Sequence, residues 1–265
     1  MYDRVLLPIS GATKVKLALD FLKDVLNPGG EITFLYVSTS VKFPGSAIEW
    51  RRAMNVVSDA SAISTAAGLS SHYEVRNSSS VAAGILEEAR SSEYDLIFFA
   101  NPYYKRGQRR VFGSVIDEVV RKSHTETAVL SYVEGRPLKY DKTLLPTSGQ
   151  RHALRAAKLT KALAKKSGGE VTVLYAGDQS QKAEAERILS EIKEIFESDN
   201  VKHFLVYRSG PVDAVILDEA RKGYDLMMVG ATEHPVYYQF LLGSIADKIV
   251  SNAPCHVLIV KTVNK

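Results

Sequence analysis

The chain has 265 residues, of which 45% are hydrophobic and 24% are charged, with a formal net charge of +4. This composition is that of a globular protein with room for two cores, and the small, dispersed excess of Lys and Arg argues against a nucleic-acid partner. A single cysteine, Cys255, excludes an internal disulfide and suits the cytoplasm, where we expect the protein. Residues 1–8 lack the pattern of a signal peptide and no apolar run reaches the ~20 residues of a membrane helix, so we expect no membrane insertion.

The first half alternates short aliphatic runs with segments of helical periodicity. Strands are predicted at residues 4–9, 31–37, 72–75, 96–100 and 127–133, and helices at 14–26, 47–67, 81–90 and from 113 onward. Residues 27–30, Asn-Pro-Gly-Gly, are predicted to break the first helix. Ser78–Ser80 offer N-cap residues to the third helix. Strands that alternate with helices predict a parallel sheet covered on both faces.

The second half repeats the first in the same order, at an offset of 130 to 139 residues. Its strands are predicted near residues 143–145, 171–175, 203–207, 226–229 and 256–260, with Val171, Leu174, Met227, Val229 and Ile259 in the core. The matching segments are Val5–Pro8 with Leu144–Pro146, Glu31–Val37 with Glu170–Ala176, Ile85–Arg90 with Ile216–Arg221, Tyr94–Leu96 with Tyr224–Leu226, and Gly113–Ile116 with Gly243–Ala246.

The repeat predicts an α/β protein of two tandem domains, residues 1–135 and 139–265, each with a doubly wound, five-stranded parallel sheet. Glu134–Pro137 form the short junction. We expect residues 128–133 and 256–260 to pair within the chain as an intrachain pseudo-dimer, because that would cover two open sheet edges.

Ligands of such sheets bind at the carboxyl ends of the strands, where the strand order reverses. A Gly-Ser pair begins the last helix of each half, at Gly113–Ser114 and Gly243–Ser244. The N-terminus of a helix favours a phosphate group because its backbone N–H groups are free and its dipole is positive there. Helix capping alone also accounts for such a pair, so the pattern leaves both explanations open.

The order of elements and these motifs resemble the universal stress protein family over nearly the whole chain, twice. The resemblance implies a Rossmann-like, adenine-nucleotide α-hydrolase-like fold. Nucleotide-binding members carry Gly-x2-Gly-x9-Gly-Ser after the fourth strand and Pro-x-Asp after the first. Here the spacing is kept and Gly230 holds the first glycine position of the second half. Tyr103 and Glu233 replace the middle glycine, and Ser10 and Ser148 replace the aspartate.

The resemblance implies ATP or AMP as a cofactor, with no metal site. The second half is the expected binding half because it retains Gly230. Its site would comprise Thr147, Ser148, Ala176, Val229, Gly230, Gly243, Ser244 and Ile245. A less favoured first-half site would comprise Ser10, Val37, Gly113, Ser114 and Val115. The cations of Lys105–Arg110 either attract a phosphate there, form a solvated loop, or contact RNA or an anionic membrane surface; the last is disfavoured because no aromatic platform accompanies them.

Catalytic patterns are not apparent. The six histidines show no metal-ligand spacing, and no nucleophile is paired with a base, so we do not expect an enzyme. Weak ATP hydrolysis through Glu233 and His234 stays open. Two functions compete: a nucleotide-binding regulatory protein of the stress response with an unknown protein partner, or a nucleotide-free scaffold or regulatory partner, for example of a transport system, with both sites vestigial. A homodimer of tandem chains also stays open.

Overall fold

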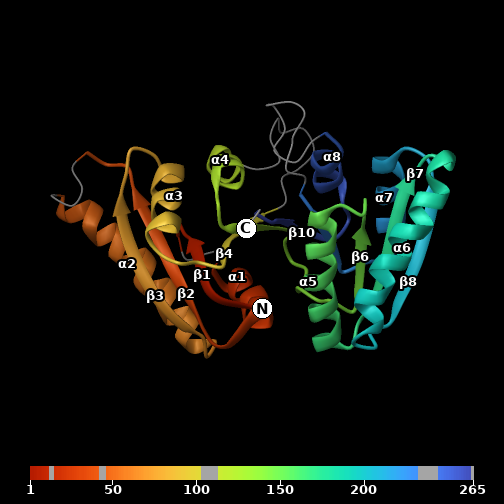
Figure 1. Ribbon diagram of the computed structural model, residues 1–265. Helices are drawn as coiled ribbons and strands as arrows, with labels where there is room; N and C mark the ends of the chain where they lie inside the picture. The colour runs from red at the N-terminus through yellow and green to blue at the C-terminus, as the bar shows by residue number, and fades with distance from the viewer. Residues whose placement is uncertain (12–14, 42–45, 103–112, 232–243, 264–265) are drawn as a thin grey trace. The chain divides into compact units, whose positions relative to one another are not determined.

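The computed structural model of the chain describes residues 1–11, 15–41, 46–102, 113–231 and 244–263. Strands and helices alternate along both halves, as Figure 1 shows, and this confirms the predicted α/β class. By the contacts among its described residues, the chain divides into one compact unit of residues 1–101 and 113–129 and a second of residues 130–262. The division into domains at 135–139 stays a prediction.

The first unit contains a sheet whose strands lie in the order β3-β2-β1-β4-β5. The pairings of β1 with β2 and β4, and of β2 with β3, are parallel. Its elements are β1 (Tyr2–Pro8), α1 (Val15–Val25), β2 (Leu26–Ser38), α2 (Ala47–Ala66), β3 (Ser70–Asn77), α3 (Val81–Ser91), β4 (Leu96–Pro102), α4 (Ser114–Lys122) and β5 (Glu126–Tyr132).

Strand β2 begins earlier than the sequence predicted, because residues 27–30 belong to the strand rather than to a turn. Tyr2 pairs with Leu26 ahead of an irregularity in the register, and the Asn27 side chain donates a hydrogen bond to Asp3 Oδ1 (2.7 Å). These contacts hold the Pro-Gly-Gly segment alongside β1.

The second unit repeats this topology, with strands in the order β10-β9-β6-β7-β8. The pairings of β6 with β7 and β9, of β7 with β8, and of β9 with β10 are parallel. Its elements are β6 (Lys142–Pro146), α5 (Arg151–Ser167), β7 (Glu170–Gly177), a short 3-10 helix η2 (Gln179–Gln181), α6 (Lys182–Glu197), β8 (His203–Ser209), α7 (Val212–Ala220), β9 (Leu226–Gly230), α8 (Ser244–Asn252) and β10 (His256–Lys261).

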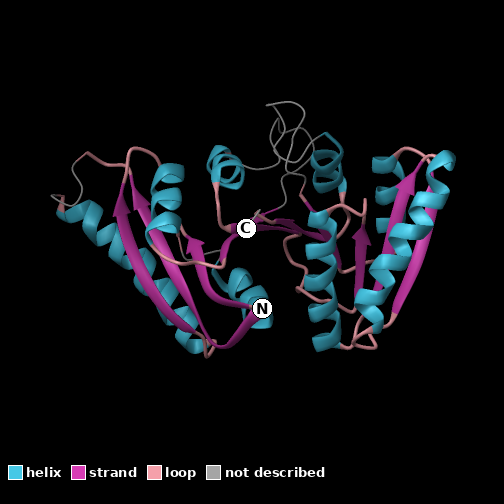
Figure 2. Cartoon of the chain, in the orientation of Figure 1, coloured by secondary structure: helices cyan, strands magenta, loops and turns pink. Residues whose placement is uncertain are grey.

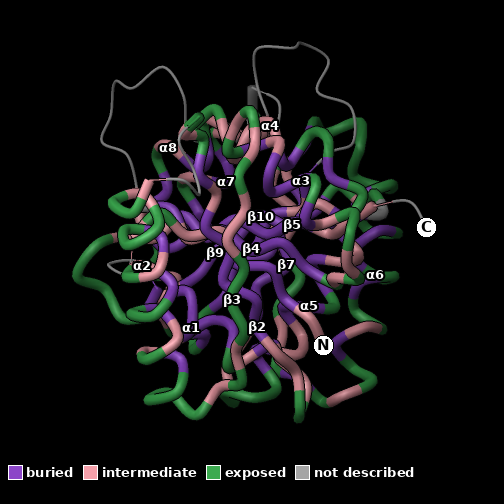
Figure 3. The backbone as a smooth tube through the Cα atoms, turned by 90° about the vertical axis from the view of Figure 1, so that its left-hand side faces the viewer, coloured by how far each residue is buried: buried purple, intermediate pink, exposed green. Residues whose placement is uncertain are grey.

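Helices cover the sheet of each unit (Figure 2). Helix α1 packs with α2 and α3 with α4 in the first unit, and α5 packs with α6 and α7 with α8 in the second. The inner strands form the buried interior, drawn in purple in Figure 3, whereas the edge strands β3 and β8 consist of exposed and intermediate residues. Leu174 and Met227 are fully buried, and Val229, the most accessible of the predicted core residues, is 8% exposed, so that prediction is confirmed. In the part of the chain that the structure describes, no helix combines the length and the apolar character that a membrane crossing needs.

The aspartate of the repeated Tyr-Asp-Leu motif forms the same kind of hydrogen bond in both units. The carboxylate of Asp95 accepts hydrogen bonds from the backbone N–H groups of Asp3 (2.7 Å) and Arg4 (2.9 Å). In the second unit the carboxylate of Asp225 accepts one from the N–H group of Lys142 (2.9 Å). The aspartate therefore joins the start of the fourth strand to the start of the first.

A buried carboxylate joins β3 to α3 in the first unit. Glu88 is 4% exposed, and its Oε2 accepts a hydrogen bond from Arg76 Nε (2.7 Å). The Tyr94 hydroxyl donates to the other oxygen (2.9 Å). Burial, the largest cause, raises the pKa of Tyr94 to about 12, so the phenol stays protonated and remains a donor.

The second unit repeats this network at Glu219, which is 3% exposed. Its carboxylate accepts hydrogen bonds from Arg208 (3.2 Å), Tyr224 (3.0 Å) and Lys222 (2.7 Å). Burial alone would raise the pKa of Glu219, but the hydrogen bonds from Lys222, Tyr224 and Arg208 outweigh it and hold the pKa below its usual value. The carboxylate is therefore ionised at neutral pH.

The segment that follows β5 belongs to the second unit and contacts the start of β10. The Val133 N–H group donates to His256 Nδ1 (3.1 Å), and His256 Nε2 lies 3.3 Å from the carbonyl oxygen of Pro137. The Arg136 side chain donates to the carbonyl oxygen of Pro254 (2.7 Å). His256 is 1% exposed, and this burial lowers its pKa.

Candidate functional site

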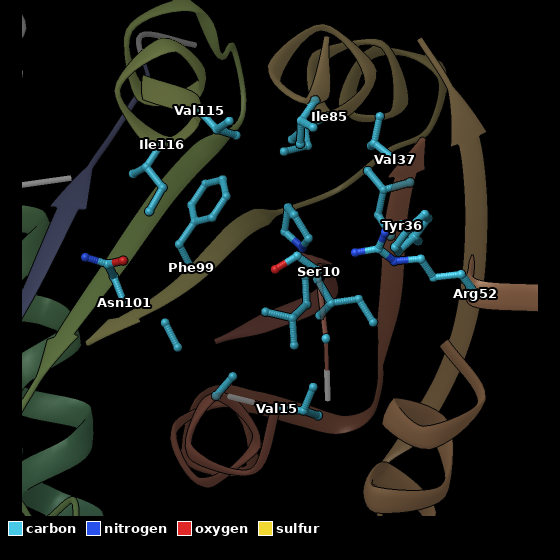
Figure 4. A pocket seen from close by; sticks show the side chains of 18 residues that line it. Ser10, Val15, Tyr36, Val37, Arg52, Ile85, Phe99, Asn101, Val115 and Ile116 are labelled. Atoms are coloured by element: carbon cyan, nitrogen blue, oxygen red, sulfur yellow. The ribbon is translucent and has the colours of Figure 1, made fainter. Parts of the chain in front are cut away.

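A cavity of about 370 Å³ lies in the first unit, at the carboxyl ends of β1, β2 and β4 (Figure 4). Strand β1 lies between β2 and β4 in the sheet, so successive strands extend to one side of it and then to the other. This reversal is where open α/β sheets bind ligands. The volume is within the range of pockets for small molecules.

The chain after β1 and the end of β2 form one wall of the cavity. The Ile9 N–H group donates to the carbonyl oxygen of Leu35 (2.9 Å), which keeps the segment after β1 beside β2. Ser10 follows, exposed, and lines the cavity. Tyr36 lines it as well and packs against Ala53 of α2, so α2 is held next to this wall.

Val37 is held in the wall by a glycine of α3. A Cβ added to Gly84 would lie 2.6 Å from Val37 Cγ1, so only glycine lets α3 come this close. Val81 and Ile85, also from α3, line the cavity beside Val37. This packing could not be predicted from the sequence, because a glycine within a helix does not indicate what the helix contacts.

The opposite wall comes from β4 and the first turn of α4. Phe99 and Asn101 of β4 are each 6% exposed, and both line the cavity with Val115 and Ile116 of α4 (Figure 4). Gly113 is the N-cap residue of α4, and it has no side chain to accept from the N–H groups of the first turn. This end of the cavity therefore lies beside a helix start without a side-chain cap.

The structure brings three of the five first-half candidates, Ser10, Val37 and Val115, together around the cavity. Gly113 and Ser114 lie at the start of α4 but are not among the lining residues. Tyr103 and the cations of 105–110 lie outside the described residues. Most other lining residues were not candidates from the sequence, among them Tyr36, Arg52, Phe99 and Asn101. Of these four, only Asn101 had a signal in the sequence, as a polar residue after an apolar strand.

In the second unit the described candidates lie at the carboxyl ends of three adjacent strands. Thr147 and Ser148 follow β6, and the Thr147 N–H group donates to the carbonyl oxygen of Leu174 in β7 (2.9 Å). Ala176 is near the end of β7, and Val229 and Gly230 end β9. Helix α8 begins with Ser244 and Ile245, whereas Glu233 and Gly243 lie outside the described residues.

Gly230 has a packing role. A Cβ at this position would lie 2.6 Å from the backbone carbonyl carbon and oxygen of His152, in the first turn of α5. His152 is itself fixed, since its Nδ1 lies 2.6 Å from the Thr262 hydroxyl in a buried contact. Close packing of β9 against α5 therefore requires glycine at 230, with or without a phosphate nearby.

The cysteine thiol is buried, and the described acidic and imidazole side chains form no metal-binding cluster. Burial raises the pKa of the Cys255 thiol to about 12, so this thiol is not ionised at neutral pH. Over the described ranges, no group of three or more His, Cys, Asp or Glu side chains is placed to hold a metal ion. The first-unit cavity is lined mainly by apolar residues, with two hydroxyl-bearing residues, an asparagine and an arginine.

Comparison with known proteins supports the resemblance. The model of the universal stress protein family matches residues 1–131 and again residues 139–261. A universal stress protein of Methanocaldococcus jannaschii is 30% identical over 144 residues, which cover 48% of this chain and 85% of that protein. A Na⁺/H⁺ antiporter of Synechocystis sp. is 28% identical over 225 residues, which cover 78% of this chain but only 30% of the antiporter.

A solved structure has the same fold along its whole length. The crystal structure of a universal stress protein from Archaeoglobus fulgidus matches with a TM-score of 0.73 at 20% identity, over 98% of this chain and 97% of that one. The predicted tandem, Rossmann-like architecture is thereby confirmed. With the family model matching twice, the chain belongs to the universal stress protein family and carries two copies of its domain in tandem.

Proposed function

We propose that the protein is a regulatory protein of the stress response that acts in the cytoplasm and binds an adenine nucleotide, ATP or AMP, in the cavity of its first unit. The supporting observation is the cavity itself, which lies where the strand order reverses and is enclosed by the ends of three strands and by the start of α4. An apolar wall with a few polar groups suits a base and ribose. Membership of the family supports regulation by binding rather than catalysis.

The choice between the two units depends on Gly230. From the sequence, this glycine favoured the second half as the binding half. Its contact with the backbone of His152 gives it a packing role, so it no longer distinguishes the halves. The first unit has the described cavity, whereas binding in the second unit stays a prediction.

Two equivalent serines allow the halves to be tested separately. Ser10 and Ser148 follow the first strand of their units, and both are exposed, so a larger side chain is tolerated at either position. Isothermal titration of ATP and AMP into the wild type should show binding. Ser10→Phe should abolish this binding by filling the cavity, whereas Ser148→Phe should leave it unchanged. The reverse result would move the site to the second unit. No heat in the wild type would reject nucleotide binding and leave the scaffold function.

A second function is favoured by the similarity to the antiporter, which extends over 225 residues and 78% of this chain. In this alternative the chain is a regulatory partner of a cation transport protein. The test adds the purified chain to membrane vesicles that contain a cation/proton antiporter from the same cell and measures Na⁺-driven proton flux. A flux that does not change across a concentration series of the chain would reject this alternative.

A further inference from the structure

The cavity of the first unit carries a single kind of charge. Among its described lining residues, Arg52 of α2 is the only one with a charged side chain, and no carboxylate is present. Figure 4 shows its side chain pointing from α2 toward the cavity, in front of Tyr36. A cleft with apolar walls and charges of one sign focuses the electrostatic potential of that sign. Arg52 is therefore the described side chain whose formal charge contributes most directly to the potential in this cavity.

Arg52 is also available to a ligand. Within the described part of the chain, its guanidinium forms no hydrogen bond or ion pair, whereas other arginines of the first unit, Arg4 and Arg76, pair with carboxylates. It is exposed, so forming a contact with a ligand would not require an internal ion pair to be broken. An arginine in this situation binds carboxylate and phosphate oxygens through two parallel hydrogen bonds.

The second unit has the opposite charge at the equivalent position. Helices α2 and α6 bury residues at the same four-, three- and four-residue spacing, which aligns Ala53 of α2 with Ala185 of α6. The residue before each alanine is Arg52 in α2 and Glu184 in α6. The residues that match in this spacing are Ala53, Val57, Ala60 and Ser64 in α2, and Ala185, Leu189, Ile192 and Phe196 in α6; helix α6 also buries Ile188.

The surroundings of Glu184 support this alignment independently. Tyr36 of β2 and Tyr175 of β7 correspond in the repeat, and Tyr36 lines the cavity with Arg52. Burial raises the pKa of Tyr175, and the nearby carboxylate of Glu184 raises it further. Each tyrosine therefore has one charged helix residue close by, a cation in the first unit and an anion in the second.

We propose that Arg52 makes the cavity of the first unit select anionic ligands over neutral ligands of the same shape, and that Glu184 gives the equivalent edge of the second unit the opposite preference. This inference rests on the proposed function, since it assumes that the cavity binds a nucleotide. Beyond that function, it names the residue that distinguishes a nucleotide from a nucleoside. It also gives a reason for the two duplicated domains to bind different ligands.

The chain offers a matched control for the arginine and a built-in probe. Arg51 is exposed and adjacent in sequence but does not line the cavity, so Arg51→Glu changes the net charge as much as Arg52→Glu does, without changing the lining. Trp50 is the only tryptophan of the chain, and it lies in α2 two residues from Arg52. Its fluorescence can follow titrations with AMP and with adenosine.

The wild type should bind AMP more tightly than adenosine, and high salt should reduce this preference because it screens the attraction. Arg52→Glu should weaken AMP binding by about tenfold or more while changing adenosine binding by less than about twofold, since only AMP carries the anionic group. Arg51→Glu should leave both affinities within about twofold of the wild type. Far-UV circular dichroism should show that both variants are folded.

Equal losses of AMP affinity in the two variants would overturn the inference, because net charge alone would then account for them. So would a parallel loss of AMP and adenosine in Arg52→Glu, which would show a contact with the nucleoside instead. Either result would leave the proposed function intact. A wild type that binds neither AMP nor adenosine would reject both the function and this inference.

Discussion

Replacing Gly230 with alanine tests whether this glycine is needed for packing rather than for a ligand. The added Cβ would lie 2.6 Å from the His152 carbonyl carbon and oxygen, and 2.8 Å from the amide nitrogen of Ala153. These are backbone atoms of α5, so they cannot rotate away as a side chain could. An ordinary contact begins at 3.4 Å, and α5 would therefore have to shift to make room. Overpacking of this kind costs about 1–3 kcal/mol.

Urea unfolding measures this cost without any ligand. For a slope of about 1–3 kcal/mol per molar urea, the midpoint of Gly230→Ala should fall by roughly 1 M. Because Trp50 is in the first unit, its fluorescence reports on that unit, whereas far-UV circular dichroism reports on both. The lower midpoint should therefore appear in the dichroism and not in the fluorescence.

Gly11→Ala is the control, since a Cβ at Gly11 would meet no atom of the described residues within 4 Å. Its free energy of unfolding should match that of the wild type to within about 0.5 kcal/mol. If Gly230→Ala also unfolded at the wild-type midpoint, α5 would have room for a side chain. The packing role would then be wrong, and the phosphate role predicted from the sequence would again explain this glycine.

Three further predictions concern stability. Leu174→Ala should cost about 2–5 kcal/mol in a urea melt because Leu174 is fully buried in β7, and a loss below about 1 kcal/mol would contradict its place in the core. Arg76→Ala should cost about 1–3 kcal/mol because it leaves the buried Glu88 carboxylate without its cation. Arg208→Ala should cost less because Lys222 also pairs with Glu219, and equal losses would refute this difference. Burial lowers the pKa of His256 in the folded state. As the pH falls below about 6.5, the unfolded chain therefore takes up a proton before the folded chain does. The free energy of unfolding should then decline by at most about 1.4 kcal/mol per pH unit. His256→Gln should lose this decline between about pH 7 and pH 5, and a wild-type profile that is flat there would disprove it.

The fold could be predicted from the sequence because the repeated motifs form equivalent hydrogen bonds in the two units. Asp95 and Asp225 each bind the start of a first strand, and Glu88 and Glu219 each bind an arginine of the third strand. Such residues recur at matching positions whatever the ligand is. The extension of β2 into residues 27–30 could not be predicted, because it depends on contacts with β1 that lie far away in sequence.

The candidate site was predictable only where it follows strand ends. Ser10 and Val37 come directly from the rule that ligands bind at the carboxyl ends of parallel strands. Arg52 could not be found in this way, because it lies on a helix beside Arg51, and the two have the same chemistry in sequence. Only the packing of α2 against Tyr36 shows which of the two faces the cavity.

The buried network of the first unit has a consequence for local opening. Strand β3 is at the end of its sheet, and such strands usually release their amide hydrogens to solvent early. Here, detaching β3 would remove Arg76 and leave the Glu88 carboxylate buried without a cation, which is costly. Amide hydrogens of β3 and α3 should therefore exchange together, as one unit. In the second unit Lys222 would still neutralise its carboxylate, so β8 should exchange ahead of α7.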